Sequence, residues 1–211
     1  MTARLRQAGD RAVLLETGDP GTTVAVAEAL RAASLPQVQD LVPASATVLV
    51  RVVKGTDLHD IGRVLLDLAA GVDTTPVTEQ PTDELLIPVV YDGPDLADVA
   101  DATGLTEAQV IAAHTGTPWR AAFVGFAPGF AYLIGGDPRL RMPRRTQSRT
   151  TVPAGSVAVA GDYSAVYPRE SPGGWQLIGT TTATLWDETA DPPALIHPGR
   201  WVRFVTAGGP A

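Results

Sequence analysis

The sequence predicts an α+β protein in which a small β-α-β-α sandwich is followed by a β-rich barrel or sandwich. Strand-like and helix-like apolar periods alternate up to about residue 70. A polar stretch with two prolines and no periodicity, GVDTTPVTEQPTD at 71–83, comes next. From Trp119 onward, short apolar runs are separated by Gly/Pro turns at intervals of about 8–15 residues, which is typical of closed all-β units.

The first unit, residues 1–83, is predicted from four apolar segments. Strands are expected at 11–17 and 47–53, and helices are expected at 22–34 and 57–70. The second helix is the clearest, because its leucine and isoleucine side chains recur on one face and Gly71 follows as a stop signal. We place the domain boundary at residue 83, at the end of the polar stretch.

The second unit, residues 84–211, opens with an apolar strand at 84–91 and two short helices at 95–102 and 106–114. The later helix begins with Thr106-Glu-Ala-Gln109, the pattern of a capping box, in which two side chains satisfy free backbone N–H groups. The β-rich region then runs to the end of the chain and carries the residues that could perform chemistry.

Composition excludes several classes of protein. The 211 residues contain no cysteine, so disulfides, thiolate metal sites and cysteine nucleophiles are absent. Residues 1–113 hold 17 acidic against 7 basic residues, a net charge of −10, and residues 114–211 hold 6 against 9, or +3. This distribution disfavours a nucleic-acid partner, which needs a broad basic face. We expect no membrane partner and a cytoplasmic location, since no apolar run reaches about 18–20 residues and the N-terminus does not resemble a signal peptide.

Arginines cluster in one segment of the second unit. Five of them fall within eleven residues: Arg139, Arg141, Arg144, Arg145 and Arg149. The segment has no helical or strand period, so it is predicted to be a loop, and arginine presents a rigid fork of donors matched to carboxylate or phosphate. The cluster is either an anion site or a solvated loop that pairs with the acidic first unit. Arg144 and Arg149 are the preferred anion ligands.

Two glycine-rich turns contain aromatic residues. In the first, Gly125, Pro128 and Gly129 bracket Phe126 and Phe130, and in the second, SPGGW at 171–175, two glycines precede a tryptophan. Such turns can aim backbone N–H groups at a bound anion beside an aromatic wall. Their spacing alone favours the simpler interpretation of tight barrel corners plugged by aromatic side chains. Neither turn is a phosphate-binding loop of the GxxxxGK[ST] type.

Histidine and serine offer few catalytic arrangements. His59, His114 and His197 are far apart in sequence and have no metal-binding spacing, so no metal site is expected. His114 follows a helix just before the turn-rich region and is a candidate acid/base group, with helix-end packing as the alternative. Ser156 and Ser171 lack the GxSxG environment of a hydrolase nucleophile.

A longer series of motifs occurs in the second unit. The motifs are GFAPGFAYL at 125–133, PRR at 143–145, Arg149, VPAGSV at 152–157, YP at 167–168 and SPGGWQLIG at 171–179. This series resembles the family of the B subunit of 5-oxoprolinase. The family is also called allophanate hydrolase subunit 1, or carboxyltransferase domain, subdomains C and D, and it includes the sensor-kinase inhibitor KipI. The likeness covers roughly residues 84–190, and the length and order of the series make it specific.

The resemblance implies a small α/β domain followed by a cyclophilin-like β-barrel domain. It also implies two partners, 5-oxoprolinase subunits C and A. Together the three proteins would hydrolyse 5-oxoproline, a small anionic lactam, to glutamate at the expense of ATP. We expect the chain to be inactive without its partners. ATP, with Mg²⁺, could be bound by the complex rather than by this chain.

On this resemblance, the catalytic residues are expected to be His114, Arg144 and Arg149. The expected substrate-binding residues are Phe126, Gly129, Phe130, Tyr132, Ser156, Ser171, Gly173, Gly174 and Trp175. The chain departs from the family pattern at Ala131 and Ser148, which replace usual prolines, and at 162–165, where Asp162 adds a negative charge near the expected anion site.

Two other interpretations remain open at this point. The aromatic residues could grip a partner protein, as in a KipI-like inhibitor of a sensor histidine kinase, because large aromatics beside prolines suit a protein–protein hot spot. Alternatively, the motifs could serve only to maintain the barrel.

Overall fold

The computed structural model describes residues 3–73 and 83–208, and the chain divides into two compact units, 1–79 and 80–211. The predicted linker at 71–83 falls largely on residues 74–82, which lie outside the described residues. Among the residues described, no helix is both long and apolar enough to cross a membrane.

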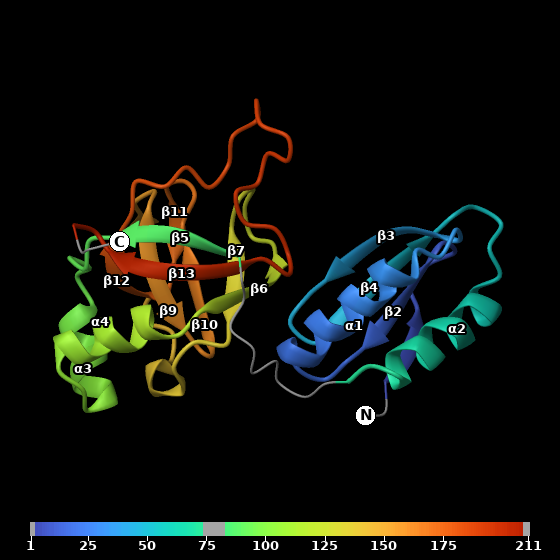
Figure 1. Cartoon of the computed structure of the whole chain (residues 1–211), viewed down its shortest axis with the longest axis horizontal. Coiled ribbons are helices and arrows are strands. Elements are labelled where there is room, and N and C mark those ends of the chain that lie inside the picture. The colour runs from blue at the N-terminus through green and yellow to red at the C-terminus, as the bar shows by residue number, and fades with distance from the viewer. Residues whose placement is uncertain (1–2, 74–82, 209–211) are drawn as a thin grey trace. The chain divides into compact units, whose positions relative to one another are not determined.

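The first unit is a two-layer sandwich of four strands and two helices (Figure 1). Its elements are β1 (Arg4–Gln7), β2 (Ala12–Glu16), α1 (Pro20–Ala33), β3 (Val38–Pro43), β4 (Thr47–Val52) and α2 (Leu58–Ala70). The strands are ordered β1-β2-β4-β3, and every neighbouring pair is antiparallel. Both helices bury apolar side chains against the central strands in a single core, so they cover the same face of the sheet.

Aspartates start both helices of this unit, as an acceptor at the N-cap position should. The Asp19 carboxylate accepts a hydrogen bond from the Thr22 amide at 2.9 Å, and Asp57 accepts from the amides of His59 and Asp60. The four predicted segments are found, and the sheet gains two further strands, β1 and β3. Both lie at the sheet edges and are largely exposed, so they lack the apolar alternation that marks a half-buried strand.

The second unit is a β-barrel with two helices against it. Its elements are β5 (Glu84–Val89), α3 (Leu96–Thr103), α4 (Glu107–Gly116), β6 (Trp119–Val124), β7 (Ala131–Ile134), a 3₁₀ turn (Pro138–Leu140), β8 (Arg149–Val152), β9 (Ser156–Ala160), β10 (Tyr163–Val166), β11 (Ser171–Gly173), β12 (Gln176–Thr180) and β13 (Trp201–Thr206). Seven strands follow the order β12-β9-β10-β7-β6-β13-β5, while β8 and β11 form a separate ribbon.

One pair of reciprocal backbone bonds links the two ends of the seven-stranded sheet. Val90 and Thr180 exchange two N–H···O bonds of 2.8 Å, which join the end of β5 to the end of β12. The sheet is therefore nearly closed and barrel-like, in keeping with the β-rich unit that the turn spacing predicted. The α+β fold prediction is therefore confirmed.

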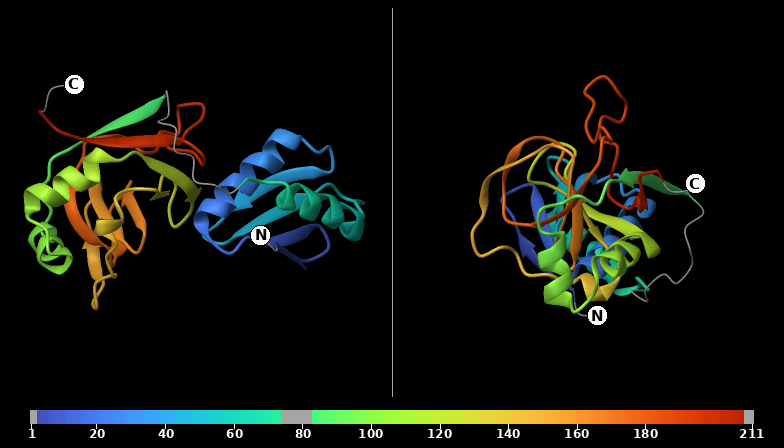
Figure 2. Two further views of the ribbon diagram at one scale, coloured as in Figure 1. Left: turned by 60° about the horizontal axis from the view of Figure 1, so that its bottom comes forward. Right: turned by 90° about the vertical axis from the view of Figure 1, so that its left-hand side faces the viewer.

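The two helices pack side by side against the barrel (Figure 1). The predicted capping box at the start of α4 is present, with Thr106 accepting from the Gln109 amide and the Gln109 side chain accepting from the Thr106 amide. The long segment between β12 and β13 projects from the barrel (Figure 2).

Candidate functional site

An aromatic cleft in the second unit brings together most of the residues that the sequence singled out. The cleft has a volume of about 110 Å³. Its walls come from the turn between β6 and β7, from the arginine segment, and from the β11 ribbon with the residues after it. The lining residues are Phe126, Phe130, Tyr132, Arg144, Tyr167, Pro172, Gly173, Gly174 and Trp175. Three predicted segments that are distant in sequence therefore meet at one place.

Edge-to-face aromatic packing fixes the shape of this cleft. Phe130 is buried at its centre, with its ring centroid 5.2 Å from Phe126, 5.3 Å from Tyr167 and 5.7 Å from Trp175, at interplanar angles of 69–84°. Such geometry is favourable for aromatic rings, whose electron-poor edges meet electron-rich faces. Contacts between the rings therefore hold the walls of the cleft together.

Phe126 has an unusual backbone conformation. Its φ is 69°, in the left-handed region that bulky residues rarely adopt, and its side chain is 58% exposed. A residue keeps this conformation only where the surrounding structure imposes it, and such residues gather at functional sites. The turn thus holds an exposed aromatic ring at the mouth of the cleft.

The glycines of SPGGW are needed for close packing. A Cβ atom on Gly173 would lie 2.4 Å from the Tyr167 hydroxyl, and one on Gly174 would lie 2.8 Å from Ser148 Oγ. Only glycine lets the backbone pass this close to Tyr167 and form part of the cleft wall. Gly129, at φ 81°, packs against Leu185 outside the lining and supports the turn.

The arginines of the 139–149 segment divide into two groups. Four of them have carboxylate partners: Arg139 with Asp137, Arg141 with Asp162, and both Arg145 and Arg149 with Asp95. Arg144 lines the cleft and makes no ion pair within the described part of the chain. It is therefore the arginine of this segment whose charge has no carboxylate partner among the described residues. The charge of Asp162 is matched by Arg141, so it does not oppose Arg144 in the way its sequence position suggested.

Asp95 connects two segments that contribute to the cleft wall, and no sequence motif pointed to this residue. Its side chain is 2% exposed, and Oδ1 accepts from Arg145 Nη1 at 2.6 Å and from Arg149 Nη2 at 2.7 Å. Oδ2 accepts from the Leu177 amide at 2.7 Å, while the Arg145 amide donates to the Gly174 carbonyl. The carboxylate thus ties the arginine segment to the strand that follows SPGGW.

Several expected site residues lie elsewhere. Arg149 was expected to bind an anion, but Asp95 engages it and it does not line the cleft. Ser156 is buried in β9 and donates to the Pro153 carbonyl, which is a structural role. Ser171 stands beside the lining residue Pro172, and its buried Oγ has no hydrogen-bond partner among the described residues. Tyr167, which the sequence marked only as part of a motif, belongs to the lining.

Two phenols share the cleft with Arg144. Burial raises the pKa of Tyr167 and of Tyr132 above the ordinary value, and the positive charge of Arg144 opposes the shift in both cases. Both hydroxyl groups are therefore neutral at physiological pH and can donate hydrogen bonds. The cleft combines one cation, two neutral donors and apolar walls.

His114 was expected to be an acid/base group, but the structure places it outside the lining of this cleft. It is fully buried, and its ring stacks on Phe204 at a centroid distance of 4.3 Å. Nδ1 lies 2.7 Å from the Tyr91 hydroxyl and Nε2 lies 2.9 Å from Ser164 Oγ. Because Ser164 donates its own proton to the Ala158 carbonyl, the pattern assigns the proton to Nε2 and leaves Nδ1 as an acceptor.

The buried histidine predicts a pH dependence of stability. Burial lowers the pKa of His114 from 6.5 to about 3. Below pH 6.5 the unfolded chain binds a proton that the folded chain does not, so stability falls as the pH drops from 6.5 towards 3. At pH 5 the loss from this group is about 2 kcal/mol. Urea unfolding at pH 7 and pH 5 measures it.

The matched variant for this prediction is His114→Gln, which removes the titrating group. Between pH 7 and pH 5, the free energy of unfolding of the variant should fall by about 2 kcal/mol less than that of the unchanged protein. Equal losses in both proteins would contradict the prediction. If the variant does not fold, NMR of the unchanged protein decides, since the His114 ring signals should not titrate between pH 5 and 8.

Comparisons with known proteins agree with this architecture. The family model described as "Carboxyltransferase domain, subdomain C and D" matches residues 3–196. The chain is 39% identical to the 5-oxoprolinase B subunit of Escherichia coli O157:H7, over 96% of this chain and 95% of that protein. The crystal structure of TTHA0988 matches with a TM-score of 0.74 and 36% identity, over 95% of this chain but only 40% of the other. The crystal structure of the Kluyveromyces lactis urea amidolyase shares the fold. It matches with a TM-score of 0.69 and 20% identity, over 97% of this chain and 15% of that chain.

Proposed function

The chain belongs to the carboxyltransferase domain family, subdomains C and D, and we propose that it is the B subunit of an ATP-dependent 5-oxoprolinase. In this role it contributes to opening the cyclic amide of 5-oxoproline to give glutamate. The observation that carries the proposal is the likeness to a 5-oxoprolinase B subunit along nearly the whole of both chains. Allophanate hydrolase subunit 1 is another name for members of the same family.

The aromatic cleft is suited to a small anionic lactam. Its volume of about 110 Å³ is well below the roughly 300–1,000 Å³ of pockets that hold drug-sized ligands, so it accepts a small ring. Arg144 would pair with the carboxylate through its guanidinium fork. The aromatic walls would contact the ring, and the neutral hydroxyl groups of Tyr132 and Tyr167 would donate to the amide carbonyl. Donors that face this oxygen stabilise the negative charge that develops on it as the amide opens.

The cleft does not fit a nucleotide. It is too small for ATP, and the sequence has no GxxxxGK[ST] loop to cradle phosphates. Among residues 3–73 and 83–208, no group of three or more histidine and acidic side chains is placed to hold a metal ion. We therefore assign ATP and its Mg²⁺ to the assembled complex, with subunits C and A supplying what this chain lacks.

The kinase-inhibitor alternative receives less support from the geometry. A protein-binding hot spot requires aromatic side chains that a partner can reach. Of the cleft aromatics, Phe126 is well exposed, whereas Phe130, Tyr167 and Trp175 are 5% exposed or less. The cleft is therefore a small hollow rather than a broad aromatic face.

Reconstitution tests the proposed function. ADP and glutamate released from 5-oxoproline would be measured with this chain alone, with candidate subunits C and A alone, and with all three together. Activity is expected only in the complete mixture, because we assign ATP to the assembled complex. Well-folded proteins that release no glutamate in any combination would overturn the proposal.

A further inference from the structure

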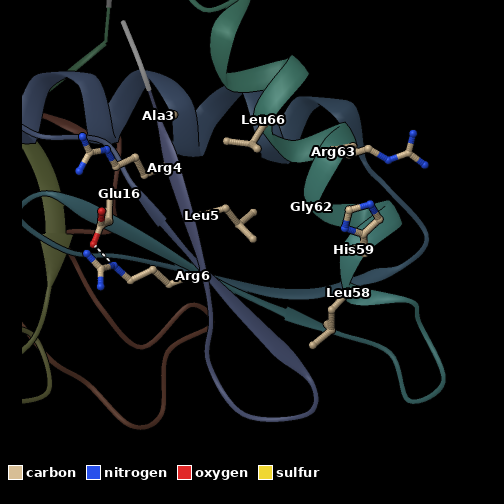
Figure 3. A pocket seen from close by; sticks show the side chains of 10 residues that line it. All are labelled: Ala3, Arg4, Leu5, Arg6, Glu16, Leu58, His59, Gly62, Arg63 and Leu66. Carbon is tan, nitrogen blue, oxygen red and sulfur yellow. Dashed lines mark hydrogen bonds and ion pairs between the residues drawn. The ribbon is translucent and has the colours of Figure 1, made fainter.

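A second, larger hollow lies wholly within the first unit, and none of its lining residues takes part in the proposed function. It is an open groove of about 550 Å³ between strand β1 and helix α2 (Figure 3). Its lining residues are Ala3, Arg4, Leu5, Arg6, Glu16, Leu58, His59, Gly62, Arg63 and Leu66. We call it the β1–α2 groove.

One wall of the groove is a sheet edge. β1 is the last strand in its sheet, and within the described chain it pairs only with β2. The backbone N–H and C=O groups that face away from β2 are therefore free to pair with another extended chain. An open edge beside a helix is the arrangement in which peptide-binding domains receive an additional strand.

The interior of the groove is apolar. Leu5 points from β1 towards α2, and Leu58 and Leu66 lie on the helix side (Figure 3). Gly62 faces Leu5 without a side chain of its own, and a Cβ atom there would lie 3.3 Å from Leu5 Cδ2. The groove thus offers a leucine floor to the side chains of an incoming strand.

Arginines of β1 and α2 give the groove a basic character. Its lining holds three arginines against one glutamate, a net charge of +2, while residues 1–79 as a whole hold 7 basic against 10 acidic residues, or −3. Arg6 pairs with Glu16, and Arg63 pairs with Asp60 in a bond whose two side chains are both 67% exposed and thus well screened. Arg4 has no ion-pair partner within the described chain.

We propose that the β1–α2 groove binds an extended peptide segment that alternates apolar and acidic residues and adds to β1 as a fifth strand. Successive side chains of a strand point to opposite faces of the sheet. On the face of Leu5 the added strand meets leucines, and on the face of Arg4 and Arg6 it meets arginines (Figure 3). The leucine face and the arginine face of the groove therefore select a peptide whose apolar and acidic side chains alternate. Main-chain hydrogen bonds to β1 supply affinity.

A designed peptide tests this proposal on the full-length chain. The probe is a fluorescein-labelled peptide with blocked ends and the sequence Glu-Val-Glu-Val-Glu-Val. Fluorescence anisotropy should show saturable binding, and NMR should show shifts at residues 4–7 and 58–66. Three comparison peptides should bind at least about 10-fold more weakly: one with lysine for glutamate, one with the segregated order Glu₃-Val₃, and one N-methylated at alternate residues.

Matched variants separate this groove from general charge attraction. Arg4→Glu places a negative charge beside the acidic side chains of the peptide and should weaken binding about 10-fold. Arg11→Glu, an exposed position outside the groove, makes the same charge change and should leave binding unchanged. Absence of binding to the folded protein, equal binding of the segregated or N-methylated peptide, or an equal effect of both variants would each overturn the proposal.

Discussion

Replacing Arg144 with glutamine should lower kcat/KM for 5-oxoproline about 100-fold in the reconstituted complex. In the described chain, Arg144 is the arginine of its segment without a carboxylate partner, and it lines the aromatic cleft. Removing one partner of a close charge pair costs about 2–5 kcal/mol, which corresponds to a factor of this size. The substrate carboxylate is charged in both the ground state and the transition state. The loss should therefore be seen mainly as a higher KM, with a smaller change in kcat.

Arg141→Gln is the control for this prediction. Arg141 belongs to the same segment, but its side chain is 73% exposed and pairs with Asp162 outside the cleft. This variant should keep the KM of the unchanged complex. Arg144→Lys should recover part of the affinity, because it restores the charge without the two-pronged fork. An Arg144→Gln complex with normal KM and kcat would exclude Arg144 as the carboxylate ligand.

The largest loss of stability is expected from Asp95→Asn. This change keeps the shape of the side chain but leaves the guanidinium groups of Arg145 and Arg149 close together without their shared counter-ion. Breaking a buried pair by removing one partner costs about 3–5 kcal/mol, and the partial exposure of the two arginines, 32% and 23%, places the expected loss near the lower end, at about 3 kcal/mol. Urea unfolding at pH 7 measures it.

The comparison variant for Asp95 is Asp162→Asn, which removes the partner of Arg141 from a pair that is more than 60% exposed on both sides. Exposed pairs contribute little, so its free energy of unfolding should change by less than about 1 kcal/mol. If the two variants lost equal stability, the Asp95 carboxylate would have no special role in holding the arginine segment.

Local signals were sufficient for the four helices and for the strands β2, β4 and β5. The capping box at Thr106 and the apolar face of α2 both predicted what the structure shows, since each depends on side chains within one or two helical turns. The edge strands β1 and β3 could not be predicted in this way. An edge strand is fixed by its partner across the sheet, and its own side chains are mostly exposed.

The residues that line the aromatic cleft were easier to single out than the residues packed around it. Phe126, Gly173 and Trp175 stand in glycine-rich turns whose composition is itself unusual, and the structure places all three in the cleft lining. Asp95 looked like an ordinary residue at the start of a helix, and its arginine partners are distant in sequence. For His114, which was expected to be an acid/base group, the sequence alone did not show that the residue is fully buried.

The hydrogen bonds of Asp95 have a consequence for the order of folding. They join positions that are 50, 54 and 82 residues apart in the chain. Contacts at such separations carry the entropy of closing long loops, so they form after local helices and hairpins. On the ribosome, a nascent chain that has not yet reached Leu177 lacks the third of these bonds, however much of the barrel has already collapsed. The full set of Asp95 hydrogen bonds can therefore form only after Leu177 has been synthesised.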